Sequence, residues 1–407
     1  MNQISEADKE QRLDSWKRIA RHFNRAERTV RRWELNENLP VHRLQHGSAS
    51  SVYAFTCELD TWLAARSTAP KPSQPSDDLN AKATEFYQKG LLQLDQVNTV
   101  ALQKAVDDFN QVIRIQPDSV LAYARKAEAL QLLCVFGARK PNDAMPEALE
   151  TISIALAHAP DNAEVNAALG MIMTCYSYDW PAAGRAFDRA ITYNPSLWSA
   201  HQWQGEYLAV IGRFSEADAA IERARVLSPS SFSIAGSKAY ILWLSRRHSE
   251  LIDEMNDLLS RNPHFPLAYI NLGLAQSGLG DFESAIETFA EGVNRTDGSP
   301  DLLALRGYAY AQGGHTKKAH EALGELRKIF GNEGCGAFHM AMVNIGLRQY
   351  GQAISQLESA YEQRVWQLNM LGHGTFFDPL RQSKRFKELL EKIGLANCAI
   401  SPNTFSK

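Results

Sequence analysis

The sequence has only five cysteines, and none of them forms a Cys-x-x-Cys pair. Scattered cysteines in odd number are typical of unbridged thiols in a reducing compartment, not of a disulfide framework. No apolar run approaches the roughly 18 residues of a membrane span. Residues 1–8 also lack the apolar core of a signal peptide. We therefore expect a cytoplasmic protein that does not engage a membrane. The cysteines are Cys57, Cys134, Cys175, Cys335 and Cys398.

Catalytic motifs are also missing. There is no Gly-x-Ser-x-Gly and no His-Glu-x-x-His, and the run 331–336 lacks the Gly-Lys-Ser/Thr of a phosphate-binding loop, so we interpret it as a turn. Cys335 and His339 lie one helical turn apart and could both bind a metal. No further Cys or His stands at zinc-like spacing, which favours packing roles for both. His42 and His46 are interpreted in the same way. We expect no catalysis, no cofactor and no metal.

Charge is divided unevenly along the chain. Residues 16–46 hold eight Lys and Arg against three Glu, whereas residues 67–407 hold 32 basic and 37 acidic side chains. The net charge of −3 therefore combines a basic head with a mildly acidic body. Only the head would attract nucleic acid electrostatically.

Residues 15–37 have the pattern of two short amphipathic helices around a tight turn. Ser15 can cap the first helix, and Asn24, which tolerates the left-handed conformation, ends it. The apolar face of the first helix consists of Trp16, Ile19, Ala20 and Phe23. At about 100° per residue, the second helix has an apolar face and an opposite basic face. These two faces consist of Ala26, Val30 and Trp33, and of Arg25, Arg28, Arg31 and Arg32.

The next segment predicts a hairpin and a third helix. The stretch 39–41, Leu-Pro-Val, stops the helical pattern, and residues 43–55 place a polar tip between two short apolar stretches. Thr56 can cap the third helix, and Leu59, Trp62 and Leu63 would pack it against the first two.

These motifs, in this order, resemble the winged helix-turn-helix domains of the MerR and excisionase group. The resemblance implies that residues 26–37 enter the major groove of DNA and that the hairpin acts as a wing beside the backbone. The wing tip, residues 46–51, lacks the Lys or Arg that relatives often place there, and no long dimerisation helix follows Trp62. The alternative is that the arginines only form the solvent-exposed face of a surface helix and do not contact DNA. The expected DNA-contacting residues are Arg25, Arg28, Thr29, Arg31, Arg32 and Arg43.

The body has a period of 34 residues. Three series keep this interval, and they place small residues in both helices of a hairpin and a proline after the second one. The series are Gly205, Ala239, Gly273, Gly307 and Ala341; Ala217, Leu251, Ala285, Ala319 and Ala353; and Pro195, Pro229 and Pro263. This pattern resembles the tetratricopeptide repeat. Upstream, the same unit recurs with longer turns, so that we expect about eight repeats.

The resemblance to tetratricopeptide arrays implies a concave groove that binds a protein or peptide. In the repeat register, seven apolar or aromatic residues would line it, although each of them could instead pack between repeats. They are Tyr240, Trp243, Ile270, Leu274, Tyr308, Phe338 and Met342.

We therefore expect a mainly α protein with four segments. Residues 1–66 would form the winged helix-turn-helix domain, 67–78 a proline-rich linker, 79–365 an α-solenoid of tetratricopeptide-like hairpins, and 366–407 a capping segment with a C-terminal helix. The expected function is transcriptional regulation: the head binds double-stranded DNA, and the array binds a protein or pairs two chains as a homodimer. Alternatives are a scaffold whose head binds protein and, less favoured, an enzyme with an unrecognised site.

Overall fold

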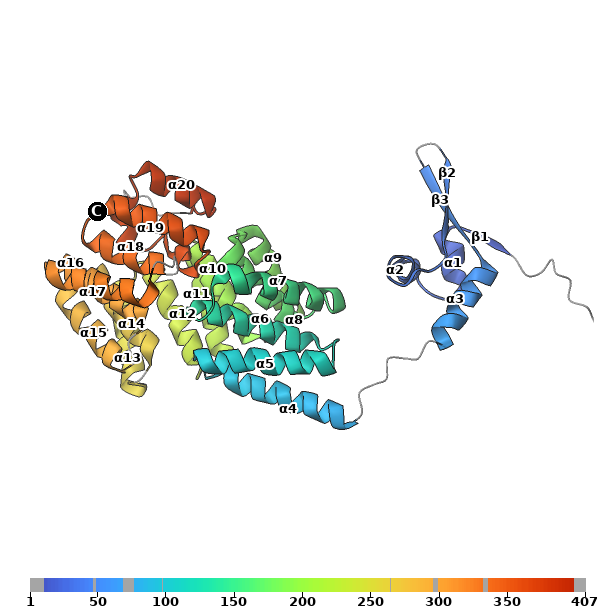
Figure 1. Ribbon diagram of the computed structural model, residues 1–407, viewed down its shortest axis with the longest axis horizontal. Helices are drawn as coiled ribbons and strands as arrows, with labels where there is room; N and C mark the ends of the chain where they lie inside the picture. The colour runs from blue at the N-terminus through green and yellow to red at the C-terminus, as the bar shows by residue number, and fades with distance from the viewer. Residues whose placement is uncertain are drawn as a thin grey trace, which may run out of the picture. The chain divides into compact units, whose positions relative to one another are not determined.

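The structure is a computed structural model that describes residues 11–46, 49–68, 77–96, 98–263, 265–295, 299–331 and 336–398. Helices predominate in it, and three short strands lie near the N-terminus (Figure 1). Contacts divide the chain into two compact units, Met1–Ser76 and Asp77–Lys407, which we call the head and the array. Helix extends into both ends of the predicted linker 67–78, and residues 69–76 of that linker lie outside the described residues.

The described part of the head combines three helices with a three-stranded antiparallel sheet. Its elements are β1 (Arg12–Asp14), α1 (Trp16–His22), α2 (Glu27–Glu37), β2 (His42–His46), β3 (Ala49–Phe55) and α3 (Thr56–Thr68). The strand order is β1-β3-β2, with Arg43 opposite Val52 in the hairpin. The sequence predicted the helices and the hairpin. It did not predict β1, which has too few residues to show a period and pairs Arg12 with Phe55.

The core of the head joins α1, α2, α3 and β3. Ile19, Val30 and Leu59 are fully buried in it. Two expected members lie outside. Ala26 is exposed because its extended backbone places it before the first turn of α2. Leu63 is 44% exposed, since the apolar face of α3 ends at Trp62, which does pack against the core.

The turn residues of the head behave in different ways. Asn24 has the expected left-handed conformation, with φ of 52°. Ser15 precedes α1 as expected, but its side chain makes no capping bond, and its N–H donates to the Val52 carbonyl at 3.0 Å. Thr56 is the first residue of α3, and its hydroxyl accepts from the Gln11 N–H at 3.2 Å. Both residues therefore connect their helices to strands of the sheet.

The described part of the array contains eight consecutive helical hairpins, as the 34-residue period predicted. The pairs are α4 (Asp77–Leu94) with α5 (Thr99–Ile115), α6 (Val120–Val135) with α7 (Pro141–His158), α8 (Ala163–Ile172) with α9 (Trp180–Tyr193), α10 (Trp198–Val210) with α11 (Phe214–Leu227), α12 (Phe232–Leu244) with α13 (His248–Arg261), α14 (Pro266–Gly278) with α15 (Phe282–Arg295), α16 (Pro300–Gln312) with α17 (Thr316–Phe330), and α18 (Ala337–Gly346) with α19 (Tyr350–Glu362). A π-helical turn, η2 (Met173–Ser177), follows α8.

Close helix pairing explains the small residues of the period. In three hairpins a glycine of the first helix lies against a fully buried phenylalanine of the second. A Cβ added at Gly90, Gly170 or Gly273 would lie 2.7, 2.6 or 2.4 Å from the ring of its partner. These partners are Phe109, Phe187 and Phe289. The five residues of the second series, from Ala217 to Ala353, are all fully buried, as expected.

The first helices of the hairpins form what we call the inner face. They contact one another in succession from α4 to α18. In a curved stack, the helices that approach most closely lie on the inside of the curve. The seven residues predicted for the groove all lie on these first helices, from α12 to α18.

The C-terminal segment does more than cap the last repeat. It contains η4 (Trp366–Met370), η5 (Thr375–Leu380) and α20 (Lys384–Lys392), and α20 does pack against α19 (Figure 1). The same segment also reaches repeats far away in the sequence. The Trp180 indole N–H donates to the Ile393 carbonyl at 2.8 Å, and the Tyr178 hydroxyl donates to the Val365 carbonyl at 3.1 Å. The expected contact with the last repeat is therefore present, and the contacts with the third repeat are additional ones that the sequence did not predict.

The close approach at Gly273 generates the first prediction. Gly273→Ala should destabilise the array by about 1–3 kcal/mol, because the new methyl group would overlap the Phe289 ring. Gly324→Ala is the matched control, because Gly324 also lies inside a helix but has open space around its Cα. That change should be neutral or stabilise by up to about 1 kcal/mol. Urea unfolding followed by circular dichroism measures both, and equal stabilities would contradict the packing argument.

The division into two units generates a second prediction. Residues 79–407 should keep their helical structure without the head, since each hairpin is buried by its neighbours and by the C-terminal segment. Limited proteolysis should cut the full chain between residues 67 and 78. Loss of helical circular dichroism after that cut would show that the boundary is misplaced.

Candidate functional site

The basic face of α2 is open to solvent. Arg25, Arg28 and Arg32 are exposed, and no ion pair to them occurs among the described residues. Val30 and Trp33, on the opposite side of the helix, are buried in the core of the head. The three guanidinium groups can therefore contact a ligand without disturbing that core.

The other predicted DNA-contacting residues are partly engaged within the head. Arg31 lies 3.9 Å from the Glu27 carboxylate, and its guanidinium stands 5.2 Å from the centroid of the Trp16 ring. Arg43 of β2 pairs with Glu34 at 2.6 Å, which connects the hairpin to α2. Thr29 is half-buried at the start of α2. Arg43 therefore positions the hairpin, a role that its place in the sequence did not reveal.

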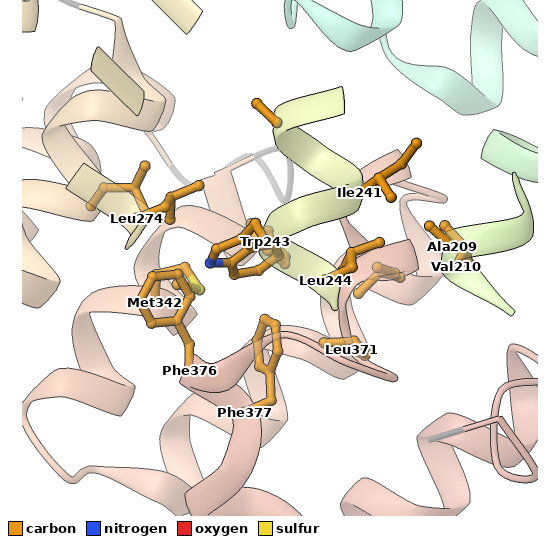
Figure 2. Packing of buried hydrophobic residues seen from close by; sticks show 14 of the residues in the cluster. Ala209, Val210, Ile241, Trp243, Leu244, Leu274, Met342, Leu371, Phe376 and Phe377 are labelled. Carbon is orange, nitrogen blue, oxygen red and sulfur yellow. The ribbon is translucent and has the colours of Figure 1, made fainter. Parts of the chain in front are cut away.

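The groove predicted on the inner face is filled. Five of its seven residues are at most 9% exposed, and the other two are partly buried against the same core. Figure 2 shows Trp243 surrounded by Leu274, Met342 and residues of the C-terminal segment. The five buried residues are Trp243, Leu274, Tyr308, Phe338 and Met342, and the two partly buried ones are Tyr240 and Ile270.

Aromatic side chains of the C-terminal segment occupy this space. The Phe376 ring lies 4.4 Å from that of Tyr308 and 5.7 Å from that of Trp243, between centroids. Phe377 lies 6.2 Å from Phe338, and Trp366 lies 6.5 Å from Tyr240. The expectation of an open groove was therefore wrong, although the register did place these residues on one face.

Polar contacts fix the segment in place. The guanidinium of Arg246, at the end of α12, donates to the Asp378 carboxylate at 2.6 Å and to the His373 carbonyl at 3.3 Å. Arg381, 5% exposed, donates to the same carboxylate at 2.7 Å and to the carbonyls of Leu371 and Gly374.

The C-terminal segment is too deeply buried to act as a removable plug. Leu368, Leu371, Phe376, Phe377 and Leu380 are each at most 3% exposed. At about 2 kcal/mol for each large apolar side chain, their burial contributes on the order of 10 kcal/mol. A peptide would have to replace all of this to open the groove. The segment is thus part of the core of the array.

The rest of the inner face is polar, and sequence reasoning missed it. A recess between α6, α8 and α10 is lined by alanines together with Arg125, Glu128, Glu164, Ser199 and Trp203. Glu206 follows Ser199 on the same face of α10, two helical turns later. Counting the 34-residue register backwards from Tyr240 reaches Glu206, so the signal was present in the sequence.

Metal binding has no support in the part of the chain that the structure describes, since no cluster of three His, Cys, Asp or Glu could hold an ion there. Cys335 lies outside the described residues. His339 stacks on Phe330 and hydrogen-bonds Asp301 at 2.9 Å. His42 stacks on Tyr53 and hydrogen-bonds Glu58 at 2.6 Å. The side chain of His46 also lies outside the described residues, as do residues 332–335 of the glycine-rich run.

No described helix combines the length and the apolar character that crossing a membrane requires.

Comparisons with known proteins concern the array. Residues 267–296, which span α14 and α15, match the tetratricopeptide repeat family model. No curated protein matches the chain. Among solved structures, the APC/C hetero-tetramer Cut9–Hcn1 is similar with a TM-score of 0.50 and 16% identity, over 83% of this chain and 59% of that one.

Two further structures are similar at lower scores. A tetratricopeptide repeat protein from Parabacteroides merdae has a TM-score of 0.46 and 15% identity, over 65% of this chain and 99% of that one. PilF of Pseudomonas aeruginosa has a TM-score of 0.40 and 13% identity, over 53% and 94%. The family match and the Cut9–Hcn1 similarity show that the array has the tetratricopeptide repeat fold, which is typically a non-catalytic scaffold for protein interactions.

The buried C-terminal segment generates the third prediction. Phe376→Ala should destabilise the array by about 3–5 kcal/mol, because the ring is 3% exposed between Trp243 and Tyr308. Phe232→Ala removes the same atoms from a side chain that is 42% exposed, and it should cost less than about 1 kcal/mol. Urea unfolding compares the two, and similar losses would mean that the segment is only loosely attached.

His373 generates the fourth prediction. Burial, reinforced by the charge of Arg381, lowers the pKa of His373 to about 4. In the unfolded chain the pKa is about 6.5, so the unfolded state takes up a proton first as the pH falls. The neutral ring therefore contributes stability that is lost below about pH 6.5, and about 2 kcal/mol should disappear between pH 7 and pH 5. His373→Gln should lose less over this interval, and equal losses would contradict the assignment.

Proposed function

We propose that the chain is a DNA-binding transcriptional regulator whose head recognises duplex DNA through α2 and whose array binds a protein partner. The observation that carries this proposal is a set of exposed arginines without an ion pair among the described residues: Arg28 and Arg32 on one face of α2, and Arg25 just before its N-terminus. The order of helices and hairpin also agrees with the winged helix-turn-helix resemblance. A helix of this kind fits the major groove, and arginine either binds phosphate or reads guanine with two hydrogen bonds.

The centre of the basic face supplies a further contact. Leu35 is 77% exposed, and at about 100° per residue from Ala26 it falls at about 180°, between Arg31 and Arg28. An apolar side chain among arginines can contact the methyl group of thymine. The same exposed leucine is the observation that favours the second candidate, a scaffold whose head binds protein.

Affinity for DNA should be modest for a single head. With about four phosphate contacts, the slope of log affinity against log salt concentration would be near −4, which corresponds to weak binding. Tight binding would require two chains on half-sites about one helical turn apart, with pairing through the array.

The fifth prediction tests the DNA-binding face. The combined change of Arg25, Arg28 and Arg32 to Ala should lower affinity for duplex DNA at least tenfold and reduce the salt slope, because three phosphate or base contacts are lost. Arg223→Ala is the control, since Arg223 is an exposed arginine of the array without an ion pair among the described residues. Fluorescence anisotropy with duplexes selected from a random pool provides the measurement.

The two candidates differ in the outcome. If the triple variant is folded by circular dichroism and binds selected and scrambled duplexes as the parent does, α2 does not bind DNA and the scaffold takes its place. If Leu35→Ala impairs DNA binding with a preference change at one base pair, the leucine reads a thymine.

A further inference from the structure

A second group of polar side chains lies on the inner face, on α6, α8, α10 and α12. We define the acidic site as Glu128 of α6, Glu164 of α8, Gln202, Trp203 and Glu206 of α10, and Tyr240 of α12. The three glutamates are half-buried, and Arg125 pairs with Glu128 at 2.7 Å. No ion pair to Glu164 or Glu206 occurs in the described part of the chain. The site therefore carries an excess of negative charge.

Among the described residues, one buried hydrogen-bond acceptor of this site has no donor. Gln202 is 3% exposed, and its amide N–H groups donate to the hydroxyls of Ser233 at 2.8 Å and Ser237 at 2.7 Å. Ser237 in turn donates to the Glu206 carboxylate. The buried carbonyl oxygen of Gln202 has no hydrogen-bond partner among the described residues. An unpaired buried acceptor is costly, so a ligand that donates here is favoured.

The surroundings of Glu206 favour a positive ligand. Burial raises the pKa of Glu206, and the hydrogen bond from Ser237 only partly opposes this effect. The Tyr240 hydroxyl is buried, and no residue in the described part of the chain hydrogen-bonds it; the pKa of Tyr240 is raised by burial and then by the charge of Glu206. A cation placed beside Glu206 would relieve both effects, because it compensates the carboxylate in a site poorly screened by water.

We propose that the acidic site binds a lysine or arginine side chain from an extended segment of a partner protein. The ammonium or guanidinium group would donate to the Glu206 carboxylate and the Gln202 carbonyl, and the aliphatic stem would lie along Trp203. Glu128 and Glu164 would attract a second basic residue of the same segment. This inference rests on the proposed partner-binding role of the array, and it does not depend on DNA binding by the head.

The test uses the full chain and a fluorescein-labelled peptide of twelve residues in which lysine and alanine alternate. A matched peptide carries acetyl-lysine at the same positions, which removes the charge but keeps the stem. Anisotropy should show at least tenfold weaker binding of the acetylated peptide. Equal binding of the two peptides would overturn the proposal.

Variants locate the binding. Glu206→Gln keeps the shape of the side chain and the hydrogen bond from Ser237, and it should weaken binding of the lysine peptide at least tenfold. Glu164→Gln should weaken it several-fold. Glu287→Gln is the control, since it removes the same charge from an exposed residue of α15 and should have no effect. If Glu206→Gln binds the lysine peptide as the parent does, or if all three variants lose affinity equally, the peptide does not bind at the acidic site.

The same samples separate this inference from the proposed function. Glu206→Gln should bind duplex DNA as the parent does, since the change lies in the array. If the parent chain binds DNA but not the lysine peptide, only the proposal for the acidic site is overturned. A chain that binds the peptide through Glu206 but not DNA supports the site and contradicts the function of the head.

Discussion

The array depends on the packing of its C-terminal segment across its own inner face. In most solenoids each repeat contacts only its neighbours, and stability is the sum of local terms. Here three hydrogen bonds link positions about 200 residues apart: Asn142 to Glu362, Tyr178 to Val365, and Trp180 to Ile393. The last repeat therefore stabilises the second and third directly, and the array becomes one cooperative unit.

This closure divides the inner face by chemistry. From α12 to α18 the face is apolar, and the chain covers it with its own aromatic residues. From α6 to α10 it carries polar residues, of which Ser199 and Gln202 are buried and Glu128, Glu164 and Glu206 are half-buried. Burial of an apolar surface by a tethered segment costs little loop entropy compared with recruiting a free peptide. Polar side chains gain little from such cover.

The sequence predicted the parts of the fold that are set by local periodicity. Small residues at intervals of 34 identified the last five hairpins, because the close approach of two helices leaves little choice at Gly273 or Ala285, and the same unit with longer turns identified the three upstream ones. The helices and hairpin of the head followed from apolar spacing in the same way. The register even placed Tyr240 and Trp243 on the inner face. DNA contact by α2 stays a prediction.

Other features depend on contacts between distant residues, which periodicity does not encode. Nothing in the local sequence indicates that Phe376 packs on Tyr308. An apolar C-terminal segment has the same sequence pattern whether it caps the last helix or packs across the inner face. Strand β1 is too short to show a period, and it forms because β3 offers a free edge. The sequence did not single out Glu206, because a glutamate in a helix is usually exposed. Only the structure shows that this one is buried, which raises its pKa.

Closure by the last segment also affects how the chain folds during synthesis. The ribosome delivers the head and the first repeats well before residues 366–395, and domains generally fold as units in that order. Until the final segment emerges, the aromatic face around Trp243 has no cover. This exposed apolar surface makes the nascent array prone to associate with other chains. Chaperones are what protects such surfaces during synthesis. A stop codon before residue 366 would leave that surface permanently open.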